Sequence, residues 1–333
     1  PLDKLFEARS FRNYFKGSFY EQALPEDFSK EEPRQFFRRP GGRASTLRTG
    51  QTSEVGRMHV AKLKGNPYFL EQLIEAATRG VDRRRREVSQ SELEAALAGR
   101  DRDRPFTEAL GRPGIALICE YKRKSPSAGE IAPGVTLEQQ VRAYESGGAA
   151  ALSVLTDEAH FDGRLEDLAA AREACRLPIL RKDFIVDRYQ LVESAARGAD
   201  AVLLIAGVLD QRRLRDFQAE ARELDLDCLV EVHNEPELHS ALEAEAEVIG
   251  INNRNLDTGV VDVDTTYELI TDVPAGKLVV SESGISSRAE LVELERVGVD
   301  AALIGESLMR SEDPSATVSE FAGLDETTEH MLP

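Results

Sequence analysis

Eight short apolar runs, each followed by an amphipathic helical pattern, fill the chain from residue 114 to residue 322. This repetition predicts a (β/α)8 TIM barrel of the α/β class, because eight strand–helix units close such a barrel in about 200 to 250 residues. A doubly wound open sheet is the alternative, but no GxGxxG follows the first run. The runs are ALICEY (116–121), AALSVL (150–155), PILRKDF (178–184), DAVLLI (200–205), DCLVEV (227–232), EVIGIN (247–252), KLVVSES (277–283) and DAALIG (300–305).

Two helices are predicted ahead of the barrel, within residues 58–113. In FLEQLIEAATRGVDRRRREV, the apolar residues Leu70, Leu73, Ile74 and Ala77 recur on one helical face. The segment SQSELEAALAG follows, with Ser89 or Ser91 as the predicted N-cap. These helices form an N-terminal helical extension to the barrel.

The two ends of the chain differ from the barrel in composition. Residues 1–57 are rich in aromatic and basic residues and include a polar, aperiodic stretch that predicts a linker or disorder. One hypothesis is that translation starts at Met58, so that residues 1–57 are not native. The other is that they form an arm that docks a partner or a second subunit. Residues 323–333 are interpreted as an acidic C-terminal tail.

The overall composition excludes several classes of protein. The net charge of the 333 residues is -18, which argues against nucleic acid or an anionic membrane as a partner. No apolar run is long enough to span a membrane, and three widely spaced cysteines indicate neither a disulfide framework nor a zinc site. We therefore expect a cytoplasmic protein. A high-salt cytoplasm and a GC-rich genome would both explain the excess of acid and the preference for arginine.

Polar side chains gather at the carboxyl ends of the predicted strands, where such barrels carry their chemistry. Residues two apart on a strand share a face, so Glu120 and Lys122 lie together, whereas Cys119 faces the helices. A salt bridge would explain any single Lys/Glu pair, but five ionisable residues at the strand ends favour a catalytic site. The polar residues at these ends are Glu120, Lys122, Lys182, Glu231, Asn252, Arg254, Glu282 and Ser283.

Lysine is scarce in this chain, and after residue 100 it occurs only at Lys122, Lys124, Lys182 and Lys277. Arginine keeps its proton near neutral pH, whereas burial or a neighbouring cation can lower the pKa of a lysine. A general acid that must give up a proton can therefore be a lysine but hardly an arginine. Lys122 and Lys182 are therefore the predicted proton donors at the carboxyl-terminal mouth of the barrel.

The loops after the seventh and eighth strands have the pattern of a phosphate site. SESGI ends the seventh strand, and IGES ends the eighth and opens a helix. Such loops bind phosphate through backbone N–H groups, and Gly284 and Gly305 would let the ligand approach closely. Ser283 could add its hydroxyl, and only the backbone N–H of Glu306 is expected to contribute.

Seven motifs, in this order, resemble the indole-3-glycerol phosphate synthase family over roughly residues 69–320. They are EYKRKSPSAG, SVLTDEAHFDG, ILRKDFIVDRYQ, LVEVHNEPEL, IGINNRNL, VSESGI and ALIGESLMRSEDP. The resemblance implies a carbon–carbon lyase (a carboxy-lyase) of tryptophan biosynthesis that uses neither a metal nor an organic cofactor. Its reaction closes 1-(2-carboxyphenylamino)-1-deoxyribulose 5-phosphate to indole-3-glycerol phosphate, with loss of carbon dioxide and water.

The resemblance also implies roles for the site residues. Lys182 would be a general acid, and Lys122 a second lysine at the substrate, oriented by Glu120. Glu231 would be the acid/base of the dehydration, and Asn252 and Glu282 would complete the polar ring. The remaining contacts to substrate would come from Ser125 and Arg254 at the anionic groups and from Phe161 and Phe184 at the aromatic ring. His233 has the parity of Glu231, but we interpret it as a loop histidine without a role.

Two other functions are alternatives to an indole-3-glycerol phosphate synthase. A phosphoribosylanthranilate isomerase would be expected to use a cysteine and an aspartate as its acid–base pair. Cys119 is predicted to face the helices rather than the barrel interior, which disfavours this function. A catalytically silent barrel that binds a phosphorylated metabolite would not need the full set of acids and bases. The expected partner is a small phosphorylated substrate, with no nucleic acid and no membrane, and the expected assembly is a monomer or homodimer.

Overall fold

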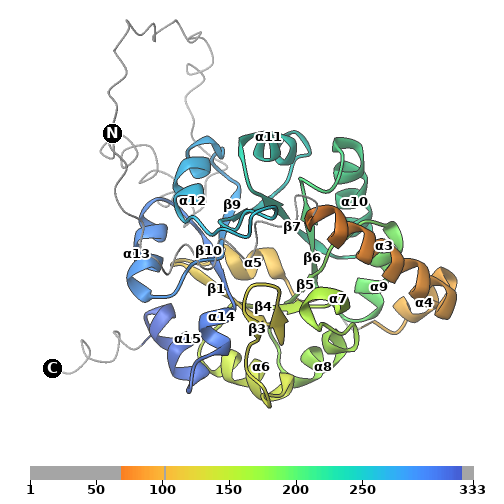
Figure 1. Cartoon of the computed structure of the whole chain (residues 1–333), viewed down its shortest axis with the longest axis horizontal. Helices are drawn as coiled ribbons and strands as arrows, with labels where there is room; N and C mark the ends of the chain where they lie inside the picture. The colour runs from red at the N-terminus through yellow and green to blue at the C-terminus, as the bar shows by residue number, and fades with distance from the viewer. Residues whose placement is uncertain (1–68, 101–102, 325–333) are drawn as a thin grey trace, which may run out of the picture.

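The computed structural model describes residues 69–100 and 103–324 and contains a closed parallel barrel of eight strands. Each strand lies within one of the eight apolar runs, so the predicted (β/α)8 fold is confirmed (Figure 1). The expectations for residues 1–57 and for most of the acidic tail fall outside the described residues. The strands are β1 (Ala116–Tyr121), β4 (Ala151–Leu155), β5 (Ile179–Lys182), β6 (Ala201–Ile205), β7 (Asp227–Val232), β8 (Val248–Asn252), β9 (Leu278–Glu282) and β10 (Ala301–Ile304).

Helices surround the barrel in the order that the sequence predicts (Figure 1). Several begin at side-chain caps, such as Thr136, Asp187 and Ser287, which satisfy backbone N–H groups of the first turn. None of the described helices is long and apolar enough to cross a membrane. The outer elements are α6 (Leu137–Ser146), α8 (Glu166–Ala174), α9 (Arg188–Ala196), α10 (Gln211–Glu223), α11 (Glu235–Glu243), α12 (Asp264–Leu269), η1 (Ile270–Asp272), α13 (Arg288–Arg296) and α15 (Pro314–Ala322).

Several short elements were not predicted. The segment after β1 forms a hairpin of β2 (Lys124–Ser125) and β3 (Gly129–Glu130). The loops after β4 and β10 contain α7 (Glu158–Phe161) and α14 (Glu306–Met309). Helix α5 (Phe106–Leu110) lies at the amino ends of the strands, where the Thr107 N–H donates to Asp227 at the start of β7. Its Phe106 and Leu110 close the bottom of the barrel core.

Alternation along the strands separates two apolar layers. Inward residues such as Ile118, Leu180 and Leu229 fill the barrel interior. Outward residues, including Cys119, pack against the surrounding helices in a second cluster. The predicted outward direction of Cys119 is therefore confirmed, and burial raises the pKa of its thiol. The period of two along each strand thus decides which residues can reach the cavity.

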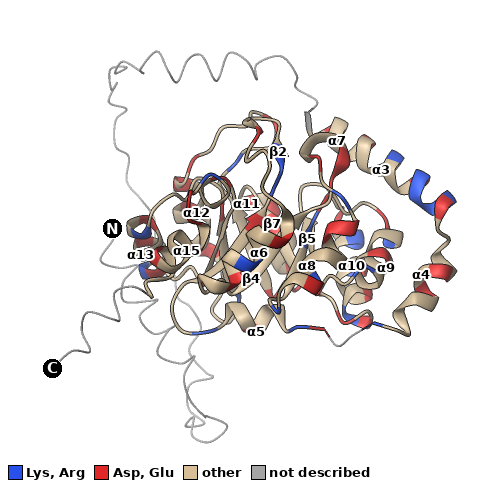
Figure 2. Cartoon of the chain, turned by 90° about the horizontal axis from the view of Figure 1, so that it is seen from below, with Lys and Arg blue, Asp and Glu red and all other residues tan. Residues whose placement is uncertain are grey.

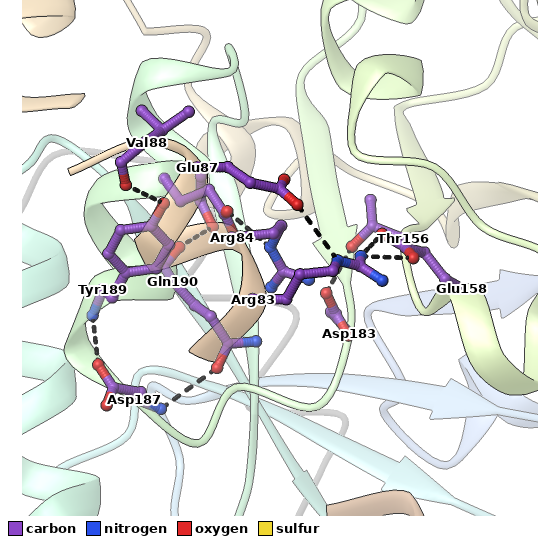
Figure 3. A network of polar contacts seen from close by, with 12 residues as sticks. Arg83, Arg84, Glu87, Val88, Thr156, Glu158, Asp183, Asp187, Tyr189 and Gln190 are labelled. Atoms are coloured by element: carbon purple, nitrogen blue, oxygen red, sulfur yellow. Dashed lines mark hydrogen bonds and ion pairs between the residues drawn. The ribbon is translucent and has the colours of Figure 1, made fainter. Parts of the chain in front are cut away.

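Helices α3 (Phe69–Glu87) and α4 (Gln90–Leu97) dock on one side of the barrel (Figure 1). Leu73 and Ala77 of α3 are buried in the interior cluster, as the predicted apolar face requires. Ser89 is the N-cap of α4 and forms a capping box with Glu92. One half of α3 is basic (Figure 2). Arg83 lies beside Glu158 at 2.7 Å (Figure 3). The next two arginines form further ion pairs, Arg84 with Glu193 at 2.7 Å and Arg85 with Asp187 at 2.5 Å.

Arg181 carries a buried charge between β5 and α9. Its side chain is only 1% exposed, and it faces outward because it alternates with the inward Lys182. Its guanidinium contacts Asp183 at 2.8 Å and Glu193 at 3.0 Å. It also donates to Thr156 Oγ1 at 3.0 Å. The planar group therefore satisfies acceptors from three segments and fixes the end of β5.

Replacing Arg181 with Met is expected to lower the free energy of unfolding by about 3–5 kcal/mol, because Asp183 would stay buried without its cation and Glu193 would keep only its pair with Arg84. Denaturant unfolding measures this difference. The control is Arg79→Met, since Arg79 forms an exposed pair with Glu75 on α3 and should change stability by less than about 1 kcal/mol. Equal effects of the two substitutions would contradict this account of Arg181.

Candidate active site

A cavity of about 510 Å³ opens at the carboxyl ends of the barrel strands. Thirteen of the fourteen predicted site residues line it, and Ser125 does not. The Ser125 hydroxyl instead accepts the Ala128 N–H inside the β2–β3 hairpin, so its contact with an anionic group remains a prediction. The thirteen are Glu120, Lys122, Phe161, Lys182, Phe184, Glu231, Asn252, Arg254, Glu282, Ser283, Gly284, Gly305 and Glu306.

A layer of four charged side chains lies at the base of this cavity: Glu120, Lys182, Glu231 and Glu282. They come from β1, β5, β7 and β9, which are alternate strands of the barrel, as expected of one side-chain layer in such a fold. The residues two positions earlier on the same strands are apolar members of the interior cluster, namely Ile118, Leu180, Leu229 and Val280. The charges therefore rest on an apolar layer, where electrostatic interactions are stronger than in water.

Lys182 joins two carboxylates of the charged layer. Its Nζ lies 2.9 Å from Glu231 Oε2 and 3.0 Å from Glu282 Oε2. Burial alone would lower the pKa of Lys182, but the charges of Glu231 and Glu282 outweigh burial and raise the pKa above its usual value. This corrects the expectation that burial or a nearby cation lowers the pKa of such a lysine. Lys182 is therefore a fully protonated donor at rest.

The two glutamates beside Lys182 differ in their protonation. Burial opposes ionisation of both, but the charges of Lys182 and then of His233 outweigh burial at Glu231 and lower its pKa below the usual range. Burial raises the pKa of Glu282 to about 7, with Lys182 opposing and Glu231 reinforcing the shift. Glu282 Oε1 has no hydrogen-bond partner among the described residues. The pair thus combines a carboxylate that stays ionised with a carboxyl group that can hold a proton near neutral pH.

Two glycines leave space for the glutamates. A Cβ built on Gly305 would lie 2.5 Å from Glu120 Oε1, and one on Gly250 would collide with Glu282 Oε1. Glu120 in turn accepts a hydrogen bond of 2.7 Å from Lys122 Nζ, as its predicted orienting role requires. A side chain at either glycine would displace a carboxylate of the charged layer.

The side of the cavity formed by the last two strands has the backbone shape of an anion site. Ser283 has φ 66° and Gly284 has φ 86°, a left-handed turn that is costly for serine and typical of functional sites. The Ser283 hydroxyl donates to Asn252 Oδ1 at 2.9 Å. Glu306 pairs with Arg310 at 3.1 Å, so its side chain is neutralised. Arg310 also lines the cavity and was missed from the sequence, although IGESLMR places it four residues after Glu306.

Apolar side chains line other parts of the cavity. Phe161 from α7 and Phe184 after β5 are joined there by Leu203, Ile205 and Leu256. Phe184 is held in place because its N–H donates to Asp183 Oδ1 at 2.8 Å. An aromatic ring therefore fits beside the charged layer without losing contact with apolar surface.

The lack of a role for His233 stays a prediction, but the structure shows which groups surround this histidine. It lies in the loop after β7, as expected, but its side chain is only 9% exposed and contacts the charged layer. Its Nε2 lies 3.2 Å from Glu231 Oε1, and its Nδ1 lies 2.9 Å from Glu237 Oε2. The shared parity with Glu231 and the glutamate four residues later were the signals in the sequence.

Within residues 69–100 and 103–324, no group of three His, Cys, Asp or Glu side chains has the arrangement needed to hold a metal ion. The outward Cys119 also leaves the cavity without the cysteine that the isomerase alternative would need. The polar groups that line the cavity are thus the amines of two lysines, several carboxyl groups, the amide of Asn252 and the guanidinium groups of Arg254 and Arg310.

Comparison with known proteins agrees with the motifs. The family model for indole-3-glycerol phosphate synthase matches residues 70–321. The indole-3-glycerol phosphate synthase of Syntrophobacter fumaroxidans is 45% identical over 258 residues, covering 77% of this chain and 97% of that protein. Indole-3-glycerol phosphate synthase 2 of Streptomyces coelicolor is 43% identical and covers 77% of this chain and 99% of its own length.

Solved structures share the fold at lower identity. The crystal structure of 3-hexulose-6-phosphate synthase from Salmonella typhimurium matches 64% of this chain and 99% of its own, with a TM-score of 0.51 and 15% identity, which shows a common barrel and nothing more. The family match covers most of the chain and all eight strands of the barrel. The chain therefore belongs to the indole-3-glycerol phosphate synthase family, the decarboxylating lyases of tryptophan biosynthesis.

Proposed function

We propose that this chain performs the family's ring closure on its charged layer, with Lys182 as the proton donor to the C2 carbonyl of the sugar. The observation that carries the proposal is the ammonium of Lys182, held between Glu231 and Glu282 at the base of the cavity. The substrate is 1-(2-carboxyphenylamino)-1-deoxyribulose 5-phosphate, which has an aromatic ring, a carboxylate and a phosphate. Each of these has a chemically matching part of the cavity.

In the first step, the ring carbon that bears the carboxylate attacks the C2 carbonyl carbon. The new carbon–carbon bond pushes electrons onto the carbonyl oxygen, which takes a proton from Lys182 Nζ. The developing alkoxide is more basic than an amine, so a lysine with a raised pKa still transfers its proton in the transition state. Lys122, oriented by Glu120, would hold the substrate carboxylate beside the ring until carbon dioxide leaves and the ring electrons return.

In the last step, the hydroxyl formed at C2 leaves as water, and the neighbouring carbon loses a proton to form the indole double bond. Glu231 is the base for that proton because it is ionised at rest. Once protonated, it can supply the leaving hydroxyl with its proton. Glu282, whose pKa is about 7, restores the proton on Lys182.

The two ends of the substrate would be held by different parts of the cavity. We assign the phosphate to the backbone N–H groups of Ser283, Gly284, Gly305 and Glu306, with Arg254 at the rim. The ring would pack against Phe161 and Phe184. Asn252, tied to the Ser283 hydroxyl, would connect the phosphate loop to the sugar hydroxyls. The protein would act in the cytoplasm as a monomer or homodimer.

Lys182→Arg is expected to lower kcat about 10²- to 10⁴-fold, because a guanidinium can hydrogen-bond to the carbonyl oxygen but cannot give up its proton. A fluorescence assay of indole-3-glycerol phosphate formation measures kcat and KM. Lys277→Arg is the control, since Lys277 precedes β9 at the opposite end of the barrel. Full activity of Lys182→Arg would exclude Lys182 as the general acid.

Glu282→Gln is expected to change how stability depends on pH. Because the folded-state pKa of Glu282 is about 7 against an ordinary 4.5, the folded wild type binds more protons than the unfolded chain between these values. The wild type therefore loses stability relative to Glu282→Gln as pH rises from 4.5 to 7, by at most about 1.4 kcal/mol per pH unit. Denaturant unfolding of both proteins from pH 4.5 to 8 gives this difference. A difference that is independent of pH would contradict the raised pKa.

A further inference from the structure

His233 is a buried ionisable group beside the cavity that the steps above leave unused. It lies between two carboxylates from different elements, Glu231 of β7 and Glu237 of α11, with contacts of 3.2 Å and 2.9 Å to its two ring nitrogens. It is not among the residues that line the cavity, so it is placed behind Glu231 rather than against the substrate.

The Glu237 side chain is fixed on several sides. Its Oε2 accepts the His233 backbone N–H and lies against His233 Nδ1, both at 2.9 Å. Its Oε1 accepts from Asn234 Nδ2 at 2.7 Å, while the Asn234 side chain caps α11 by accepting the Glu237 N–H. Gly207, after β6, leaves the space, because a Cβ there would lie 2.9 Å from Glu237 Oε1. The orientation of the imidazole ring is thus determined by the start of α11.

The charges around the ring favour an imidazolium. Nδ1 makes a hydrogen bond with Glu237 Oε2, whereas Nε2 lies 3.2 Å from Glu231 Oε1 as an ion pair without hydrogen-bond geometry. A protonated ring places its positive charge between the two carboxylates. Burial alone would lower the pKa of His233, but the carboxylates of Glu231 and Glu237 outweigh burial and raise the pKa to about 10. Beyond Glu231 the next charge is Lys182 of β5, which Glu282 of β9 shares.

We propose that His233, clamped by Glu237, is a positioning residue that holds Glu231 ionised and directs its Oε2 towards Lys182 and the substrate. The proposal rests on the role of Glu231 as the base of the dehydration. The two carboxylate oxygens of Glu231 then have separate partners, since Oε1 lies beside His233 Nε2 and Oε2 accepts from Lys182 Nζ. When Lys182 gives its proton to the carbonyl oxygen, His233 remains as the cation that keeps Glu231 ready to accept a proton.

This arrangement predicts a selective effect on kcat. His233→Asn keeps a short polar side chain but removes the charge, so Glu231 loses its second cation while the cavity lining stays intact. We expect kcat to fall about tenfold or more, in the range of general acid–base contributions, with KM within about twofold of wild type. Glu237→Gln should lower kcat in the same direction. His239→Asn, on the exposed face of α11, is the matched control and should leave both constants unchanged.

A double-mutant cycle with Glu231→Gln separates the two proposals. If His233 acts through Glu231, His233→Asn lowers kcat in the wild type and has no further effect in Glu231→Gln. Equal losses in both backgrounds would overturn the role of His233. Wild-type kcat in Glu231→Gln would instead overturn the role of Glu231 itself.

Histidine side-chain NMR gives a readout that needs no activity. The signal assigned by its loss in His233→Asn should titrate near pH 10 in the wild type and at lower pH in Glu231→Gln and in Glu237→Gln. Titration of that signal near pH 6.5 in the wild type, or no change in the variants, would overturn the proposal.

Discussion

The ammonium of Lys182, held by two buried carboxylates, is the interaction on which the rest of the site depends. It forms ion pairs with Glu231 and Glu282 at the base of a cavity whose floor is apolar, where carboxylates without a cation would be costly. The neighbouring strands are adapted to it, since Gly250 leaves room for Glu282 and Gly305 leaves room for Glu120. The barrel interior therefore has a layer of charged side chains that rests on a layer of apolar side chains.

Adjacent residues on β5 show why the chain uses both basic side chains. Arg181 points to the helices, where it donates hydrogen bonds to Asp183 and Thr156 and forms an ion pair with Glu193, a task that suits a planar group with five donors. Lys182 points into the cavity, where the proposed first step needs a proton that can leave. The alternation of the strand separates the structural cation Arg181 from the proposed proton donor by a single residue. In this proposal, the need for a transferable proton accounts for a lysine at the mouth of the barrel in a chain rich in arginine.

Much of this arrangement could be predicted from the sequence. The eight apolar runs define the strands, and the period of two assigns Glu120 and Lys122 to the cavity and Cys119 to the helices. What could not be predicted depends on contacts between distant segments. The Ser125 hydroxyl accepts a hydrogen bond inside a short hairpin, and the pattern of apolar residues does not predict that hairpin. The direction in which the pKa of Lys182 shifts depends on two glutamates that lie 49 and 100 residues further along the chain. The burial of His233 between Glu231 and Glu237 was not predicted, because His233 follows the last residue of β7 and its ring position depends on the start of α11.

The most direct test of the central claim is the titration of Lys182 itself. The chain has nine lysines, so the ε-carbon signals of a lysine-labelled sample can be followed by NMR, with Lys182→Met to assign the signal. The account predicts that the Lys182 signal stays that of an ammonium beyond the pH of about 10.4 at which ordinary lysines titrate, and that Glu231→Gln lowers its titration point. A wild-type Lys182 that loses its proton below that pH would contradict the account.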